Sequence, residues 1–410
     1  MERSISADRA VELLTAGVRP VGTEWVPVQA ALGRVLAEEI RAEQNVPPFA
    51  RSPLDGYAFR SADTCAASAE TPAELRVIAQ TTAGAAPAGP VGRGEAVKVS
   101  TGAPVPEGAD CVIAYERTEF TAHTVRIAQP CGPGNIVPIG EDVCAGQLLA
   151  PAGSVVTGGL MGLLAGQGLQ KIPVYRRPSV CMISTGTELR EAGQPLLRGQ
   201  IYNSNGTTLC ALLRLLGADP QNAGILPDDS YTIAAEISAR LETADLVITT
   251  GGASVGEFDY AHSAAVLAGG TVLYHKAGFK PGGAMLGAVR GEQRILSLSG
   301  NPGAAAVGLL RVGAPLIYRL AGRREPGFPK IQVRLAQDFP KESCCQRLLR
   351  GSLRIEAGQA LFSLHEGQNN GSVRALAGMN LLAELPAHSS PLPAGTLVDA
   401  YWLGGLECGL

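Results

Sequence analysis

The middle of the chain alternates short apolar runs with longer segments of helical periodicity. The apolar runs predict strands at Val180–Ile183, Asn222–Leu226, Leu246–Ile248 and Ile295–Leu298. Apolar residues at helical spacing predict helices near Gly206–Leu216, Tyr231–Glu242 and Ala304–Leu320. Such alternation is typical of a doubly wound parallel sheet with right-handed crossovers and helices on both faces. Ligands of such a sheet bind at the carboxyl ends of its strands.

The segment Asp245–Tyr260 joins one of these strands to a glycine-rich turn. Leu246–Ile248 is apolar throughout, which suits burial on both faces of a sheet. Gly251, Gly252 and Gly256 then let backbone approach a ligand closely, and we expect a helix to begin soon after. The pattern indicates an anion-binding turn, although an ordinary strand-to-helix turn has the same composition.

Period-two alternation on either side of this region predicts two β domains. In the first, we expect strands at Arg76–Ala79, Ala96–Val99, Cys111–Ala114 and Thr124–Ile127. In the second, which would resemble a β-barrel, we expect strands at Gln332–Leu335, Leu353–Ile355, Ala360–Leu364 and Leu397–Trp402.

The N-terminal part is predicted to be helical. Ser6 can cap a helix that runs from Ala7 to about Ala16, and a second helix is expected over Gln29–Glu39. The apolar segment Val155–Leu169 is too short to span a bilayer of about 30 Å, so it predicts a buried helix.

These elements divide the 410 residues into four expected domains of a multidomain α/β plus β protein. A helical domain takes residues 1–45 and 143–175, and a small β domain takes 46–142. The α/β domain takes 176–325, and the last β domain takes 326–410.

Composition narrows the functional classes. With 34 basic and 37 acidic residues, the chain has no basic face for nucleic acid and no polybasic membrane anchor. The nine cysteines have no metal-binding spacing, and no stretch resembles a signal peptide. We therefore expect a cytoplasmic protein with neither nucleic-acid nor membrane partners.

Three strand ends of the α/β domain share hydroxyl and glycine residues. Their backbone N–H groups and hydroxyls would lie at the edge where such a sheet binds phosphorylated ligands. The candidate binding residues are Ser184, Thr185, Gly186, Gly251, Gly252, Ser254, Gly256, Gly300, Asn301 and Pro302.

Carboxylates occur at the same edge and in two loops rich in Gly and Pro. Beside phosphates such a cluster usually binds Mg²⁺, although each acid alone could equally be a helix cap or a solvated loop residue. The edge acids are Glu188, Asp228, Asp229 and Asp259, and the loop acids are Asp55, Glu141 and Asp142. For Asp229, which stands beside Ser230 at a predicted helix start, capping is favoured.

Lys276 and Lys280 lie in a short stretch with Pro and Gly, and they could contact anionic groups as point charges. The alternative is that both are ordinary surface lysines.

Seven motifs, in this order, resemble the molybdopterin molybdotransferases, the bacterial molybdenum-insertion enzymes related to the E domain of gephyrin. They cover nearly the whole chain. They are Leu54–Ala58, Thr101–Gly108, Gly140–Asp142, Ser184–Gly186, Gly252–Glu257 with Asp259 and Tyr260, Lys280–Gly282, and Gly300–Pro302.

The resemblance implies an elongated homodimer of four-domain subunits whose central domain binds molybdopterin. Such an enzyme takes adenylylated molybdopterin and molybdate as substrates, inserts the metal into the dithiolene, and releases AMP with the help of Mg²⁺. Its cleft is shared between subunits, and an adenylyltransferase and apo-molybdoenzymes are further partners.

The resemblance also assigns roles by position. Asp228 and Asp259 resemble the Mg²⁺ ligands, whereas Glu188, Asp142 and Asp55 resemble residues at the molybdate and pterin end. Residues that resemble anion-contacting or last-domain cofactor positions are Thr101, Lys276, Lys280, Arg350 and Ser372.

Four positions depart from the family pattern: Thr187, Val137–Ile139, Gly283 and Ser299. Two of these departures remove positive charge, and one charge-assisted contact is worth about 1.5–3 kcal/mol. Two alternatives therefore stay open. One is a weakly active or inactive paralogue that acts as a molybdopterin-binding or scaffold protein, and the other is a tungstate-inserting variant.

Overall fold

The computed structural model describes residues 1–252 and 260–404. Ser254, Gly256 and Asp259 lie outside these described residues. The chain forms two compact units. The larger unit comprises Met1–Glu38, Ala152–Thr157 and Lys171–Leu410, and the smaller comprises Glu39–Pro151 and Gly158–Gln170.

A seven-stranded sheet forms the centre of the larger unit, with strand order β1-β17-β19-β20-β16-β12-β15. β20, β16, β12 and β15 are parallel, as expected, and antiparallel pairing of β19 with both of its neighbours extends this parallel core. A two-residue connection between β19 and β20 allows only antiparallel pairing. The strands are β1 (Glu2–Ile5), β12 (Ser179–Thr185), β15 (Asp219–Leu226), β16 (Leu246–Thr250), β17 (Thr271–Ala277), β19 (Leu286–Arg290) and β20 (Gln293–Leu298).

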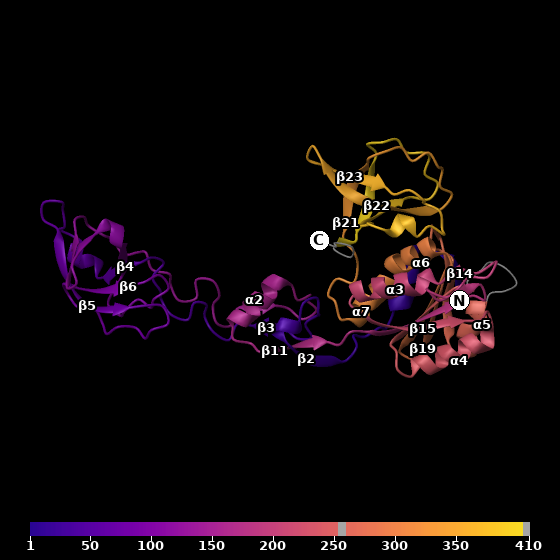
Figure 1. The fold of residues 1–410 in the computed structure, drawn as a ribbon, viewed down its shortest axis with the longest axis horizontal. Coiled ribbons are helices and arrows are strands. Elements are labelled where there is room, and N and C mark those ends of the chain that lie inside the picture. Colours follow the sequence, from indigo (N-terminus) through magenta and orange to yellow (C-terminus); the bar gives the residue numbers. More distant parts are fainter. Residues whose placement is uncertain (253–259, 405–410) are drawn as a thin grey trace. The chain divides into compact units, whose positions relative to one another are not determined.

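Helices cover both faces of this sheet (Figure 1). Alternate strand residues lie on opposite faces, so Met182 and Ile248 belong to one core while Ile183 and Val247 belong to the other. Helices α1 (Ala7–Thr15), α3 (Ser204–Leu215), α6 (Pro302–Gly308) and α7 (Ala314–Leu320) supply the first core, and α4 (Ser230–Leu241) and α5 (Tyr260–Leu267) supply the second.

The expected caps are confirmed. The Ser6 hydroxyl accepts a hydrogen bond from the Arg9 amide at the start of α1. Asp229 accepts one from the Thr232 amide at the start of α4.

One segment, Pro302–Leu320, is long and apolar enough to cross a membrane, with a mean hydropathy of 1.2, but 89% of its most apolar window is buried in the protein. It joins α6 to α7 through a π-helical turn over Leu309–Gly313. Its Arg311 forms an ion pair with Asp8 of α1. This segment is therefore the central core helix of the larger unit.

The C-terminal strands close into the expected barrel. β22 pairs with both β23 and β24, and the remaining pairings complete a ring of five strands. The strands are β21 (Lys330–Leu335), β22 (Gln346–Glu356), β23 (Gln359–Leu364), β24 (Leu381–Leu385) and β25 (Leu397–Trp402). The short β18 (Phe279–Lys280) joins this sheet beside β22.

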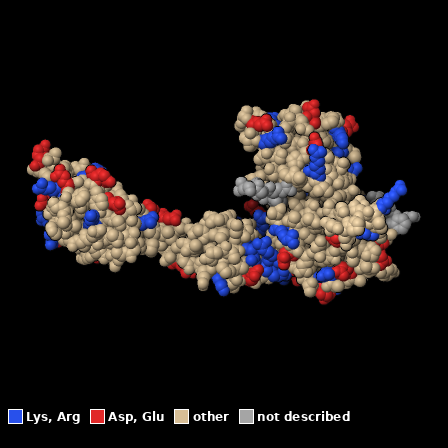
Figure 2. Space-filling model, viewed as in Figure 1, with Lys and Arg blue, Asp and Glu red and all other residues tan. Residues whose placement is uncertain are grey.

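The smaller unit contains a six-stranded sheet with order β7-β4-β6-β5-β9-β8 and one apolar cluster on each face. Its strands are β4 (Gly56–Phe59), β5 (Ala73–Thr81), β6 (Glu95–Val99), β7 (Cys111–Ala114), β8 (Glu119–Phe120) and β9 (Thr124–Ile127). All four expected strands are present. On the face in Figure 2, acidic and basic side chains are intermixed over this unit.

In the N-terminal part, one helix prediction was wrong, and a second was right about the helix but wrong about its burial. The region Gln29–Glu39 holds only a 3₁₀ turn, Val28–Ala30, because Gly33 adopts a φ of +72°, which ends any helix. Val155–Leu169 does contain a helix, α2 (Gly158–Gly166), but within it only Leu164 is buried. Its four glycines remove the side chains that a buried face needs.

The central core predicts a selective stability effect. Leu296→Ala should lower the free energy of unfolding by about 2–5 kcal/mol, because Leu296 is fully buried in β20. Urea unfolding followed by tryptophan fluorescence measures this effect in the larger unit, which contains both tryptophans, Trp25 and Trp402. Leu197→Ala, at a leucine that is 70% exposed, is the control and should change the value by less than about 0.5 kcal/mol.

Candidate functional site

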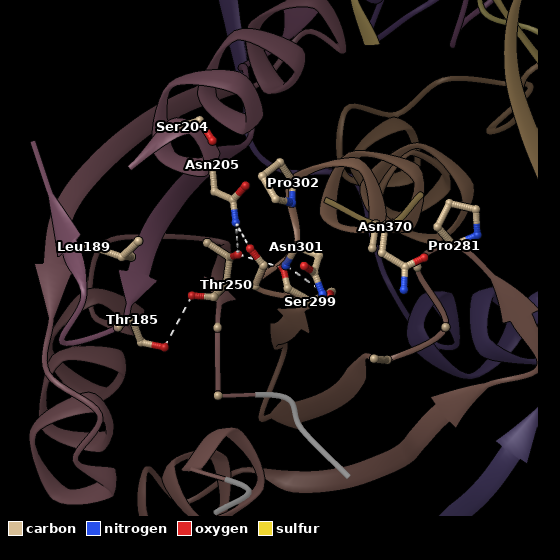
Figure 3. Close-up of a pocket in the computed structure, with 18 of the residues that line it drawn as sticks. Thr185, Leu189, Ser204, Asn205, Thr250, Pro281, Ser299, Asn301, Pro302 and Asn370 are labelled. Carbon is tan, nitrogen blue, oxygen red and sulfur yellow. Dashed lines mark hydrogen bonds between the residues drawn. The ribbon is translucent and has the colours of Figure 1, made fainter. Parts of the chain in front are cut away.

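A cleft of about 750 Å³ opens at the carboxyl ends of β12, β16 and β20 in the larger unit. This is the edge at which the sequence predicted ligand binding, and the volume suits a small-molecule site. Figure 3 shows its wall, to which the strand-end loops, the start of α3 and the start of α6 contribute.

Buried hydrogen bonds hold three strand ends together at the base of the cleft (Figure 3). The Asn205 amide nitrogen donates to the Thr250 hydroxyl and to the Gly300 carbonyl, both at 2.8 Å. Thr250 in turn donates to the Ser299 carbonyl at 2.9 Å, and Thr185 donates to the Thr250 carbonyl at 3.3 Å. Because these groups are buried, the network fixes the loops around it.

Gly251 packs directly against the neighbouring strand end. Its φ is +102°, and a Cβ atom there would lie 2.3 Å from the Thr185 carbonyl oxygen. Only glycine satisfies both constraints. Glycine is therefore required at the first position of the glycine-rich turn by close packing as well as by backbone conformation.

Two carboxylates line the cleft. Asp228 accepts a hydrogen bond from the Thr187 amide at 3.3 Å. Glu188 lies against Gly186, since a Cβ there would come within 2.7 Å of its carboxylate. Asp229 instead caps α4, and its hydrogen bonds from Thr232 lower its pKa.

Two lysines, Lys276 and Lys280, also line the cleft. Lys276 adopts a φ of +71°, and a left-handed conformation costs a non-glycine residue roughly 1–2 kcal/mol. Such strained residues concentrate at functional sites. The cleft therefore presents two cations and two anions around a set of neutral donors.

Most of the predicted site residues of the larger unit meet at this cleft. Those that line it are Glu188, Asp228, Lys276, Lys280, Thr185, Gly186, Gly251, Gly252, Gly300, Asn301 and Pro302. Ser184 lies beneath the surface and donates to the Asn203 side chain at 3.0 Å. Among the described residues, no three Asp, Glu, His or Cys side chains form a metal-type cluster, and Asp259 is not among those residues.

Arg350 and Ser372 do not line the cleft. Arg350 is fully buried, and its guanidinium donates to the carbonyls of Gly367, Asn369 and Ser372. Burial lowers the pKa of Arg350. These bonds hold the loop that carries Asn370, and Asn370 lines the cleft.

The predicted residues of the smaller unit include one interacting pair. The Asp55 carboxylate accepts hydrogen bonds from the amide of Thr101 at 2.7 Å and from its hydroxyl at 3.2 Å. Asp142 is exposed.

The sequence prediction missed Asn205 and Asn370. Asn205 stands in the stretch Asn203–Asn205 at the start of α3, where Asn203 is the N-cap. An asparagine directly before a helix predicts a cap. The sequence therefore carries no separate signal that Asn205, two residues later, hydrogen-bonds to two strand ends. Nothing local marks Asn370, because the buried Arg350 places it.

The comparisons with known proteins agree with this geometry. Residues 5–168 match the model of the MoeA N-terminal region (domain I and II), and residues 181–319 match that of a probable molybdopterin binding domain. The crystal structure of the molybdopterin biosynthesis moeA protein from Pyrococcus horikoshii OT3 is similar, with a TM-score of 0.82 at 29% identity, covering 97% of this chain and 100% of that one. Fold and cleft thus define a MoeA-type protein.

Curated relatives identify the family. The chain is 35% identical to a molybdopterin molybdenumtransferase of Bacillus subtilis over 96% of its own length and 93% of the relative. It is 34% identical to that of Staphylococcus aureus strain MRSA252, over 91% and 90%. The chain belongs to the molybdopterin molybdenumtransferase family, a family of transferases, as the sequence motifs implied.

The packing of Gly251 gives a test with a matched control. Gly251→Ala should lower the free energy of unfolding by about 1–3 kcal/mol more than Gly193→Ala, because only the first Cβ overlaps backbone. Gly193 has a similar left-handed φ of +90° with no atom within 4 Å of an added Cβ. Urea unfolding measures both variants, and equal losses would show that the overlap is relieved at no cost.

Proposed function

We propose that this chain is a molybdopterin molybdenumtransferase that inserts molybdate into adenylylated molybdopterin and releases AMP. The observation that carries the proposal is the cleft, where backbone donors, two lysines and two carboxylates surround about 750 Å³. Family membership supports the reaction class, because the curated relatives carry this name.

The cleft residues suit the chemistry of the two substrates. Molybdate is a tetrahedral oxyanion, and its oxo groups must leave as water when dithiolene sulfurs replace them. We assign the delivery of the protons that this loss requires to Glu188, which lines the cleft. Lys276 and Lys280 supply positive charge for the oxyanion or for phosphate.

The donor set also suits Mg²⁺. Asp228 and Glu188, with the hydroxyl and carbonyl oxygens of the strand ends, are hard oxygen ligands of the type that Mg²⁺ prefers beside phosphates. We propose Asp228, together with Asp259 as the resemblance implies, as its protein ligands. When bound, the ion would neutralise charge on the departing phosphate.

We further propose a cytoplasmic homodimer, as in the family pattern described above. In such a dimer, Asp55, Thr101 and Asp142 of one chain would belong to the cleft of the other chain. An adenylyltransferase that supplies the nucleotide-linked substrate, and apo-molybdoenzymes that accept the product, are the proposed partners.

One observation favours a second candidate function. Where the family commonly has lysine, this chain has Gly283, and a Cβ there would lie 2.2 Å from the Ala277 carbonyl and 2.3 Å from that of Phe279. No residue larger than glycine fits at this position of the turn. The backbone geometry therefore excludes the lysine that the family commonly has there, together with its positive charge. A protein that binds molybdopterin tightly but turns over poorly would result if Lys276 and Lys280 do not compensate.

The deciding experiment is AMP release from adenylylated molybdopterin, with and without molybdate and Mg²⁺. We expect release that depends on molybdate, together with activation of an apo-molybdoenzyme by the product. Tight pterin binding without release would instead establish the scaffold function, and a preference for tungstate would establish the variant enzyme.

Within this assay, Asp228→Asn should lower kcat by about 10²-fold or more, because the ion that Asp228 is proposed to hold would stabilise transition-state charge by several kcal/mol. Asp219→Asn is the matched control, since Asp219 is an exposed aspartate at the other end of β15. An unchanged kcat for Asp228→Asn, with normal Mg²⁺ dependence, would remove Asp228 from the mechanism.

A further inference from the structure

The sheet of the smaller unit places a lysine on an apolar face. Ala96 and Lys98 of β6 share a face because side chains alternate along a strand, and Ala96 belongs to the same core as Tyr57 and Phe59. Val97 and Val99 belong to the opposite core. Within β4, β6 and β7, Lys98 is the one charged residue on its face, and it is half-buried there.

Lys98 forms part of a polar row across three strands. It is paired in register with Tyr57 of β4 on one side and with Gln80 of β5 on the other. All three line a cavity of about 630 Å³, whose far wall is the segment 120–122. This volume falls within the range of about 300–1,000 Å³ that small-molecule sites occupy.

The rings of Tyr57 and Phe120 form part of the apolar lining of this cavity. The Tyr57 ring centroid lies 5.3 Å from that of Tyr115 and 5.8 Å from that of Phe120. Phe120 is 52% exposed at the wall of the cavity, so one ring of this cluster is available to an incoming ligand. Aromatic rings at such spacings readily accept another flat ring.

The polar groups of the cavity differ in their hydrogen bonds. The Thr121 hydroxyl is paired with that of Thr124, whereas Lys98 and Tyr57 form no side-chain hydrogen bond or ion pair with the described residues. Lys98 is half-buried, and the Tyr57 hydroxyl is not among the buried groups that lack a partner, so both groups reach solvent through the cavity. The Lys98 nitrogen lies 5.2 Å from the centroid of the Tyr115 ring, which is a cation–π distance. Burial raises the pKa of Tyr57, so the hydroxyl remains a hydrogen-bond donor at neutral pH.

We propose that this cavity binds a flat aromatic ring that carries one anionic group, a phosphate or a carboxylate. The anion contacts Lys98 and the Tyr57 hydroxyl, while the ring packs against Phe120. The cavity is lined by residues of the smaller unit alone.

The test uses the full chain labelled with 3-fluorotyrosine. Tyr57→Phe and Tyr115→Phe assign the two ¹⁹F resonances that report on this cavity and not on the cleft. AMP and 6-carboxypterin are the ring-and-anion probes, and adenosine and inorganic phosphate are their neutral and ring-free counterparts. We expect at least one of the joined probes, AMP and 6-carboxypterin, to shift these resonances saturably. The counterparts that lack the anionic group or the ring should bind at least tenfold more weakly.

Lys98→Met then separates a binding role from a structural one. It should weaken the joined probe about tenfold, the value of one charge-assisted contact, and leave the melting temperature equal or higher, because methionine suits an apolar face. Lys171→Met removes an exposed lysine elsewhere and should change neither property. A lower melting temperature for Lys98→Met, without any loss of binding, would show that Lys98 serves the fold through Tyr115. That result, or the absence of a shift with every probe, would overturn the proposal.

Discussion

Burial of the central strands on both faces is the constraint on which the rest of the larger unit depends. β12, β16 and β20 have helices above and below, so their interior positions must be apolar. Polar side chains occur near the carboxyl ends of the strands, where buried Thr249 and Ser297 also hydrogen-bond to each other at 2.9 Å. Because the three strands are parallel, Thr185, Thr250 and Ser299 therefore meet at one edge.

The neutral polar groups at this edge and the charged groups around it have different tasks. The Asn205 amide donates to the Thr250 hydroxyl and the Gly300 carbonyl, and Thr250 donates to the Ser299 carbonyl. These hydrogen bonds rigidify the loops without placing a charge in the interior. The charges of Asp228 and Lys280 lie on the cleft wall, where a ligand can reach them. Their positions are thus defined before any substrate arrives, and such preorganisation is what a site for a polyanionic substrate needs.

Features that depend on short-range pattern could be predicted from the sequence. The apolar run Leu246–Ile248 indicated a doubly buried strand, and Asp229 beside Ser230 indicated a helix cap. The helix expected over Gln29–Glu39 failed because helical spacing of apolar residues also fits a chain whose Val35 and Leu36 form isolated β-bridges to distant segments. Short-range pattern cannot distinguish these two outcomes.

Some residues of the candidate site could likewise be predicted from short-range pattern, and others could not. Glycines and hydroxyls at strand ends were visible because they interrupt apolar runs. Asn205 and Asn370 were not, since their roles come from contacts across the fold. Lys98 was hidden for a third reason: alternation predicts the strand β6 equally well whichever face its lysine occupies.

The pairing of β1 with β17 has a consequence for how the protein is made. Glu2 aligns with Tyr274, so β1 lacks its neighbour until the segment that contains Tyr274 has been synthesised. The smaller unit, which ends at Gln170, has all of its residues well before then. Vectorial synthesis therefore favours early folding of the smaller unit, while the N-terminal strand and α1 wait for a long-range contact that closes late.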